Sequence, residues 1–225
     1  MVVTDFVMES NDEKNLTVPK CKAWWENIQK KDYFKKETKT DADFHLSKPD
    51  LIAGLNLTKS SFILEFGCGF GRETRKFCEI SDNVYGLDIS QEAADLTKTN
   101  APKSITASFD GINVPHKDNM FDLTYSCFVI QHMSKPSALA LMKESKRVLK
   151  VGGHILFEFF SGSDYCAGKG KELYSGGLEG MYNNGWKMEE IRQAIEEVGM
   201  EAIYLNEYEV QKGISNIWAC CKKVD

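Results

Sequence analysis

The sequence lacks both a stretch apolar enough to cross a bilayer and an excess of basic residues. Of its 225 residues, 42% are hydrophobic and 27% are charged. No run approaches the ~18–20 consecutive apolar residues of a membrane-spanning helix. Residues 1–14 contain no basic region followed by an apolar core, so we expect no signal peptide. The net charge of −5 argues against a nucleic-acid partner, which usually demands a basic face. We therefore expect a cytoplasmic protein with no membrane and no nucleic-acid partner.

Cysteine is present, but never in the C-x-x-C spacing of zinc and redox sites. The seven cysteines are an odd number, and several of them lie in apolar or strand-like contexts. Reduced thiols in an intracellular protein are expected rather than disulfides. We also find no set of oxygen ligands from which a magnesium site could be assembled, so no metal is expected.

Length and patterning predict a tail followed by one domain. Residues 1–20 are polar and aperiodic, which is typical of a mobile tail, and residues 21–225 fit a single domain. Within it, residues 21–60 carry aromatic residues among lysines and are expected to form an N-terminal helical lid. Residues 161–186 are rich in Gly and Tyr and are expected to form an insertion on the acceptor side. Plain packing remains an alternative role for these aromatic residues.

From residue 62 onward, strand-like and helix-like patterns alternate, which indicates a parallel sheet with helices on both faces. Strands are predicted at 62–66, 83–88, 104–109, 121–128 and 153–160, and helices at 71–80, 90–99, 136–150 and 187–198. Two further runs, 201–209 and 214–222, are expected to pair as an antiparallel hairpin.

The link between Asp110 and Phe121 is the most informative gap in this pattern. It is shorter than the dozen or more residues that a parallel crossover normally needs. The third and fourth strands are therefore not expected to be neighbours. The chain should instead pass from one side of the first strand to the other. That arrangement creates a topological switch point, where open α/β sheets bind ligands.

A glycine-rich turn follows the first predicted strand. Residues 62–72 read FILEFGCGFGR, an apolar run that ends at Glu65 and then three alternating glycines before a helix. Glycines let a ligand approach the backbone, and an acidic strand end suits a ligand with hydroxyls or an amine. The spacing E-x-G-x-G-x-G differs from the G-x-G-x-x-G of dinucleotide sites.

Several segments together resemble class I S-adenosylmethionine-dependent methyltransferases, in particular the small-molecule branch. The resembling segments are the turn from Glu65 to Gly71, VYGLD at 84–88, DGINVP at 110–115, FDL at 121–123 and RVLKVGG at 147–153. The resemblance implies a Rossmann-like seven-stranded sheet in the order 3-2-1-4-5-7-6, with the last strand antiparallel and helices on both faces. It also implies S-adenosyl-L-methionine as the cofactor.

The resemblance assigns acidic residues to two parts of this cofactor. Asp88, followed by Ile89, would bind both ribose hydroxyls, although an Asp at this position can also cap the next helix. Asp110 would accept the adenine amino group, with the amide of Gly111 facing the ring. The alternative for Asp110 is a simple turn residue, because Asp-Gly is a strong turn signal.

Other positions would face the methionine moiety of the cofactor. Besides Glu65, the predicted set is Gly67, Cys68, Gly69, Arg72, Ser126 and Cys127. Arg72 would pair with the methionine carboxylate, but an ion pair with Glu73 is at least as good an interpretation.

Two residues are candidates for a general base. His132 follows the fourth strand on the reaction side, and Glu158 lies near the end of the fifth. An imidazole titrates near pH ~6.5, which suits proton removal from a hydroxyl, although His132 can also merely pack or cap a helix. The N-P-P-Y segment typical of nucleobase and glutamine methylation is absent. We therefore expect a methyltransferase for a small-molecule acceptor, preferably a hydroxyl. The alternatives are a non-catalytic cofactor-binding protein of the same fold and a nicotinamide-dependent oxidoreductase.

Overall fold

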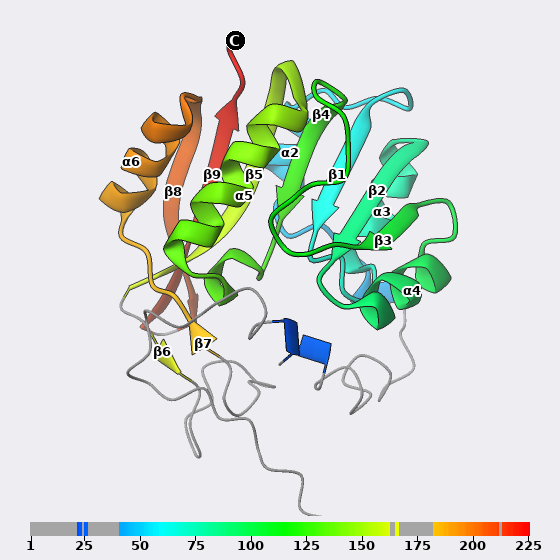
Figure 1. The fold of residues 1–225 in the computed structure, drawn as a ribbon, viewed down its shortest axis with the longest axis horizontal. Helices are drawn as coiled ribbons and strands as arrows, with labels where there is room; N and C mark the ends of the chain where they lie inside the picture. The colour runs from blue at the N-terminus through cyan, green and yellow to red at the C-terminus, as the bar shows by residue number, and fades with distance from the viewer. Residues whose placement is uncertain (1–21, 24, 27–40, 163–164, 167–181, 212) are drawn as a thin grey trace, which may run out of the picture.

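The computed structural model describes residues 22–23, 25–26, 41–162, 165–166, 182–211 and 213–225 (Figure 1). The predicted tail, residues 1–20, lies outside the described residues. So do 21, 24 and 27–40 of the N-terminal segment, and 163–164 and 167–181 of the predicted insertion. Within the described ranges, no helix is both long and apolar enough to cross a membrane.

A seven-stranded sheet forms the centre of the protein, in the order β3-β2-β1-β4-β5-β9-β8. Strands β1 to β5 are parallel, and β9 runs antiparallel to both of its neighbours, β5 and β8. The strands are β1 (Phe62–Phe66), β2 (Asn83–Asp88), β3 (Ile105–Ser108), β4 (Phe121–Ser126), β5 (Leu149–Ser161), β8 (Glu201–Gln211) and β9 (Ile214–Lys222). The predicted order 3-2-1-4-5-7-6 is confirmed, since β8 and β9 are its sixth and seventh strands.

Helices cover both faces of this sheet (Figure 1). The longer helices are α2 (Pro49–Gly54), α3 (Arg72–Ile80), α4 (Gln91–Asn100), α5 (Lys135–Val148) and α6 (Met188–Val198). Two short 3-10 helices are η2 (Asp41–Asp43) and η3 (Ile130–His132). Two short strands, β6 (Tyr165–Cys166) and β7 (Tyr182–Asn183), pair with each other beyond the end of the main sheet (Figure 1).

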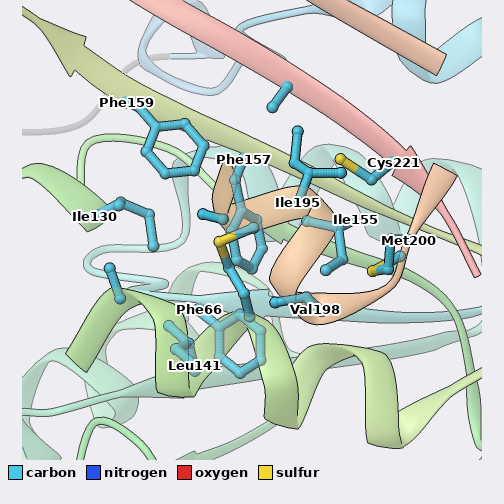
Figure 2. Close-up of a cluster of buried hydrophobic side chains, with 14 of the residues drawn as sticks. Phe66, Ile130, Leu141, Ile155, Phe157, Phe159, Ile195, Val198, Met200 and Cys221 are labelled. Atoms are coloured by element: carbon cyan, nitrogen blue, oxygen red, sulfur yellow. The ribbon is translucent and has the colours of Figure 1, made fainter. Parts of the chain in front are cut away.

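The alternation of side chains along β1 divides the core between the two faces. Ile63 packs in a cluster with Phe77 of α3 and Ile52 of α2. Leu64 and Phe66 point to the opposite face, where α5 and α6 pack. Figure 2 shows aromatic and aliphatic side chains from β1, β5, α5 and α6 meeting there. Because both faces of β1 are buried, its short run is apolar apart from Glu65.

The switch point lies where the sequence predicted it. β1 pairs with β2 on one side and with β4 on the other, so the chain leaves β3 and crosses β1 to begin β4. The loops that follow β1 and β4 therefore diverge to opposite faces of the sheet. This divergence leaves the carboxyl ends of β1 and β4 accessible to a ligand.

Several strand boundaries differ from the prediction by one to four residues, and the differences in β4 and β5 have a clear structural cause. β4 ends at Ser126, because Phe128 has a positive φ of 58° that an extended strand does not allow. β5 begins at Leu149 rather than at 153, because Leu149 pairs with Phe121 of β4 and the Gly152 amide donates to the Lys223 carbonyl at 2.8 Å. The two glycines there favour a loop by local pattern, and Gly152 does have a positive φ of 84°, but the pairing with β4 keeps the start of the segment in the sheet.

Candidate functional site

The glycine-rich turn between β1 and α3 has a backbone that only glycine adopts easily. Gly67, Gly69 and Gly71 have φ values of +68°, +57° and +87°. A Cβ built on Gly67 would lie 2.1 Å from Cγ2 of Val129, in the loop after β4. The turn therefore needs glycine for its conformation and, at Gly67, for the close approach of the neighbouring loop.

Helix α4 holds the carbonyl groups of the same turn. The hydroxyl of Thr97 donates to the carbonyl oxygens of Cys68 and Gly69, at 3.2 and 2.9 Å. The Asn100 amide donates to the carbonyl of Phe70 at 2.8 Å. Nothing in the local sequence indicates these contacts, because they join residues about 30 positions apart. They fix the turn before any ligand arrives.

Asp88 ends β2 beside this turn. Its carboxylate accepts hydrogen bonds from the backbone amides of Gly69 and Ser90, both at 2.9 Å. Burial raises the pKa of Asp88, while the two amide donors act to lower it. Each carboxylate oxygen retains a lone pair for a further donor. The predicted helix-capping role belongs to Ser90, whose hydroxyl accepts from the Ala93 amide, and the half-buried Ile89 lies between the two.

Glu65 lies on the face of β1 that carries α3. Only 2% of the residue is exposed, and Thr74 of α3 donates its hydroxyl hydrogen to the carboxylate. Burial raises the pKa of Glu65 well above its ordinary value, and the nearby Glu73 carboxylate raises it further. A cationic or hydroxyl-bearing ligand at this position would favour the ionised carboxylate.

Asp110 and Gly111 lie in the loop after β3. The exposed Asp110 carboxylate accepts from the amides of Ile112 and Asn113 at 2.9 and 2.7 Å, so it forms a turn of its own. The side-chain amide of Asn113 also donates to this carboxylate, and it lowers the pKa of Asp110 together with the two backbone amides in spite of the opposing effect of burial. Arg147 of α5 fixes the same loop by donating to the carbonyls of Val114 and His116, each at 2.9 Å.

Arg72 points toward protein groups. Its guanidinium contacts the Glu73 carboxylate at 2.6 Å, the Ser47 hydroxyl at 3.3 Å and the Cys127 sulfur at 3.3 Å. Burial acts to lower the pKa of Arg72, but the Glu73 carboxylate outweighs it and holds the pKa above its ordinary value. The ion pair with Glu73 is one of the two interpretations that the sequence allows, and it occupies much of this side chain.

The residues after β4 are held by Glu158 of β5. Its Oε2 accepts from the Cys127 thiol at 3.2 Å and from the Phe128 amide at 3.1 Å. Its Oε1 accepts from the side-chain amide of Asn216 at 2.9 Å and from the Tyr208 hydroxyl. Burial raises the pKa of the Cys127 thiol, and the Glu158 carboxylate raises it further. Each oxygen of this carboxylate thus accepts two hydrogen bonds.

Ser126 is the last residue of β4, next to the glycine-rich turn. It pairs with Phe66 across the sheet, so it lies at the carboxyl end of β1. The residue is fully buried, and its hydroxyl has no hydrogen-bond partner among the described residues. Buried polar groups are rarely left in this state, so a ligand is a natural partner for this hydroxyl.

His132 ends η3, on the same edge of the sheet. It is 9% exposed, and its ring packs edge-on against Trp25 with centroids 5.4 Å apart. The Gln131 amide nitrogen lies 3.4 Å from Nε2 of His132. Trp25 therefore brings the N-terminal segment to the candidate base.

The predicted cofactor residues thus gather around the carboxyl ends of β1, β2 and β4. Asp110 and Gly111 follow β3 on the adjacent loop, and His132 and Glu158 lie on the β4–β5 side. The arrangement fits S-adenosylmethionine. The glycine-rich turn lets a ligand approach the backbone, and the buried carboxylates of Glu65 and Asp88 flank the turn. The Ser126 hydroxyl has no hydrogen-bond partner among the described residues and could bind a ligand. Among the residues that the structure describes, no three His, Cys, Asp or Glu side chains are grouped to hold a metal ion.

Comparison with known proteins finds similarity over the central part of the chain. Residues 64–157 match the family described as "Methyltransferase domain". A curated relative, the tRNA N(3)-methylcytidine methyltransferase trm141 of Schizosaccharomyces pombe, is 27% identical over 157 residues. That alignment covers 64% of this chain and 59% of the relative. The chain spans only 23%, 59% and 45% of the length of three of the curated relatives that it matches.

Solved structures of low sequence identity share the fold. A SAM-dependent methyltransferase from Methanosarcina mazei superposes with a TM-score of 0.66 at 20% identity, covering 80% of this chain and 99% of the other. The 1,6-didemethyltoxoflavin-N1-methyltransferase of Burkholderia thailandensis gives 0.66 at 15% identity, covering 91% and 87%. That structure contains 1,6-didemethyltoxoflavin and S-adenosylhomocysteine. Residues 64–157 thus match a methyltransferase domain, and the solved structures share the fold of this chain.

Proposed function

We propose that this protein transfers a methyl group from S-adenosylmethionine to a hydroxyl group of a small-molecule acceptor. The observation that carries the acceptor side of this proposal is the position of His132. This side chain is nearly buried, lies at the carboxyl edge of the sheet and packs against Trp25. A reacting group must be small enough to reach an imidazole enclosed in this way.

The proposed cofactor contacts follow the geometry of the strand ends. Asp88 would accept the ribose hydroxyls through its remaining lone pairs, and the loop of Asp110 and Gly111 would face the adenine. Gly67, Cys68 and Gly69 would line the methionine moiety, opposite Ser126 and Cys127. S-adenosylmethionine, when bound, supplies an electrophilic methyl group on a sulfonium.

Arg72 has a reduced part in this proposal. Its terminal nitrogen already contacts the Glu73 carboxylate at 2.6 Å, and Nε is buried without a hydrogen-bond partner among the described residues. We propose that Nε, rather than the paired terminal nitrogen, is the atom left to meet the methionine carboxylate.

His132 would act as the general base. A neutral imidazole nitrogen can accept the proton of the acceptor hydroxyl while the oxygen attacks the methyl group. Proximity supplies much of the remaining rate enhancement, because the methyl group is already activated. The contact of Gln131 with Nε2 of His132 would keep the ring in one orientation.

Glu158 is better suited to hold the loop than to move a proton. Its two oxygens accept four hydrogen bonds, one of them from the amide of Phe128, whose φ is positive. We propose that Glu158 fixes the residues after β4 against the glycine-rich turn. It remains the rival to His132 for the base.

An acceptor panel tests this proposal. The protein is incubated with S-adenosylmethionine and a set of small alcohols and sugars, a matched set of amines, and bulk tRNA, and S-adenosylhomocysteine release is measured. The tRNA arm is needed because one relative is a tRNA methyltransferase. We expect release with hydroxyl compounds. Release with the amines alone would refute the hydroxyl assignment, and release with tRNA alone would refute the small acceptor.

A further inference from the structure

Two buried amide side chains near the candidate base have polar atoms without hydrogen-bond partners in the described part of the chain. Asn183 of β7 is 1% exposed, and neither its Oδ1 nor its Nδ2 has a partner there. Gln131 of η3 is 2% exposed, and its Oε1 likewise has none. Between them these two residues leave two acceptor oxygens and one donor nitrogen unsatisfied.

Hydrogen bonds of the adjacent Asn184 bring together the segments that carry the two residues. The amide of Asn184 donates to the Gln131 carbonyl at 2.6 Å, and the Asn184 side chain donates to the Met133 carbonyl. A little further on, the Trp186 amide donates to the Phe160 carbonyl of β5 at 2.8 Å. β7 therefore lies against η3, which carries His132, beyond the carboxyl edge of the sheet (Figure 1).

The neighbouring asparagine provides a comparison within the same segment. Asn184 is buried and its side-chain nitrogen is satisfied, whereas the side chain of Asn183 is more deeply buried and makes no hydrogen bond to any described residue. A buried amide without partners is destabilising, and such groups are uncommon in folded proteins. An apolar residue would fit an interior position better. Asn183 is therefore placed for a partner that the described residues do not supply.

We propose that Asn183 and Gln131 bind the methyl acceptor through a neutral, amide-like edge. By this we mean a planar group that presents N–H donors beside an acceptor atom, as a carboxamide or the edge of a pyrimidine does. Nδ2 of Asn183 donates to the acceptor atom, and the two free oxygens receive the N–H donors. This inference rests on the proposed function, since it concerns the acceptor of the same reaction.

The count of donors and acceptors excludes charged alternatives. A carboxylate has no hydrogen to offer to the two free oxygens, so they would stay unsatisfied and would repel it. An ammonium group has no acceptor for Nδ2 of Asn183. The Asn183 side chain has both ends free, so exchanging its nitrogen and oxygen leaves the conclusion unchanged.

The test uses two probes and one charged analogue. Benzamide represents a carboxamide, cytidine represents a pyrimidine edge, and benzoate is the charged counterpart of benzamide. Each is titrated by NMR into protein saturated with S-adenosylhomocysteine. We expect benzamide, cytidine or both to bind, and benzoate not to bind. Binding of benzamide alone would indicate a carboxamide acceptor, and binding of cytidine alone would indicate a pyrimidine acceptor. Failure of both neutral probes, or equal binding of benzoate, would overturn the proposal.

Two variants separate a binding role from a structural one. Asn183→Ala should weaken binding of the probe at least about tenfold, the effect of losing one or two hydrogen bonds. It should not lower the melting temperature. The control Asn184→Ala removes a satisfied hydrogen bond and should lower the melting temperature by about 2–4 °C. Equal destabilisation by both variants, or unchanged probe binding in Asn183→Ala, would overturn the proposal.

S-adenosylhomocysteine binding is measured separately in every variant. Wild-type protein that fails to bind S-adenosylhomocysteine would refute the proposed function itself. Normal S-adenosylhomocysteine binding without probe binding would refute the amide-edge inference alone.

Discussion

The turn after β1 and the segment around η3 and β7 lie on the same edge of the sheet, yet they are built differently. In the turn, the carbonyls of residues 68–70 receive donors from α4, and Asp88 receives the amide of Gly69. Around η3, both ends of Asn183 and one end of Gln131 are buried without partners among the described residues. This difference supports our proposals that the glycine-rich turn is already in place for the cofactor and that the segment around η3 and β7 would be completed by the acceptor.

The largest effect is expected on the acceptor side. His132→Ala should lower the turnover rate by about 10²–10⁴-fold, the usual contribution of a general base. The affinity for S-adenosylhomocysteine should barely change, because the proposed role of the imidazole is toward the acceptor. In the wild type the rate should rise with pH, since only a neutral ring can accept the proton. Steady-state kinetics and a binding titration measure the two quantities.

Glu158→Gln is the matched variant for this prediction. It retains the size of the side chain while weakening the hydrogen bonds that hold the loop after β4. If Glu158→Gln abolishes turnover and His132→Ala does not, the roles that we give the two residues are reversed. If neither slows transfer more than about tenfold, proximity alone accounts for the rate.

The next effect concerns the stability of the cofactor turn. Gly67→Ala should lower the free energy of unfolding by about 2–4 kcal/mol, because a positive φ and a contact with Val129 both oppose a Cβ. Gly54→Ala is the control, since a Cβ added to Gly54 would have no neighbouring atom within 4 Å. Urea unfolding of the two variants gives the comparison. Equal free energies of unfolding for Gly67→Ala and Gly54→Ala would contradict the account of a fixed turn.

A smaller effect is expected where α4 contacts the turn. Thr97→Val retains the side-chain shape but removes the donor to the carbonyls of Cys68 and Gly69, and should cost about 1–3 kcal/mol of stability. Thr99→Val is the control, because the Thr99 hydroxyl donates only to an exposed helix carbonyl. Unfolding curves that coincide for the two variants would show that α4 does not hold the turn.

The smallest effect is a dependence on pH that arises from Glu65. Burial raises the pKa of Glu65, and Glu73 adds to the shift. Between the ordinary pKa and this raised value, the folded protein retains a proton that the unfolded chain has lost. The free energy of unfolding therefore falls as pH rises through that window. Glu65→Gln should reduce this fall, which urea unfolding at several pH values would detect. The prediction is contradicted if the free energy of unfolding falls with pH by the same amount in the wild type and in Glu65→Gln.

The sequence predicted the sheet well because its signals are local. The apolar runs, the glycine turn and the short link from Asp110 to Phe121 depend on neighbouring residues, and the order of the strands follows from that link. The predicted end of β4 is wrong because the positive φ of Phe128 is fixed by Glu158, about 30 residues away. No local pattern indicates that contact.

The candidate site was predicted unevenly for the same reason. Asp88 and the glycines occupy strand ends and turns, so their positions could be inferred. The partners of Arg72 and Glu158, and the support from Thr97, depend on tertiary contacts. Asn183 gave no signal at all, because a buried side chain without partners is recognised only when everything around it has been placed.

Titration of S-adenosylhomocysteine into three proteins tests the difference between the two regions most directly. Calorimetry would compare the wild type with Asp88→Ala, on the cofactor side, and Asn183→Ala, on the acceptor side. We predict that Asp88→Ala weakens binding by about 1.5–3 kcal/mol, the range for hydrogen bonds to a charged group, and that Asn183→Ala binds like the wild type. Unchanged affinity in Asp88→Ala, or an equal loss in both variants, would contradict the division of this edge into a cofactor side and an acceptor side.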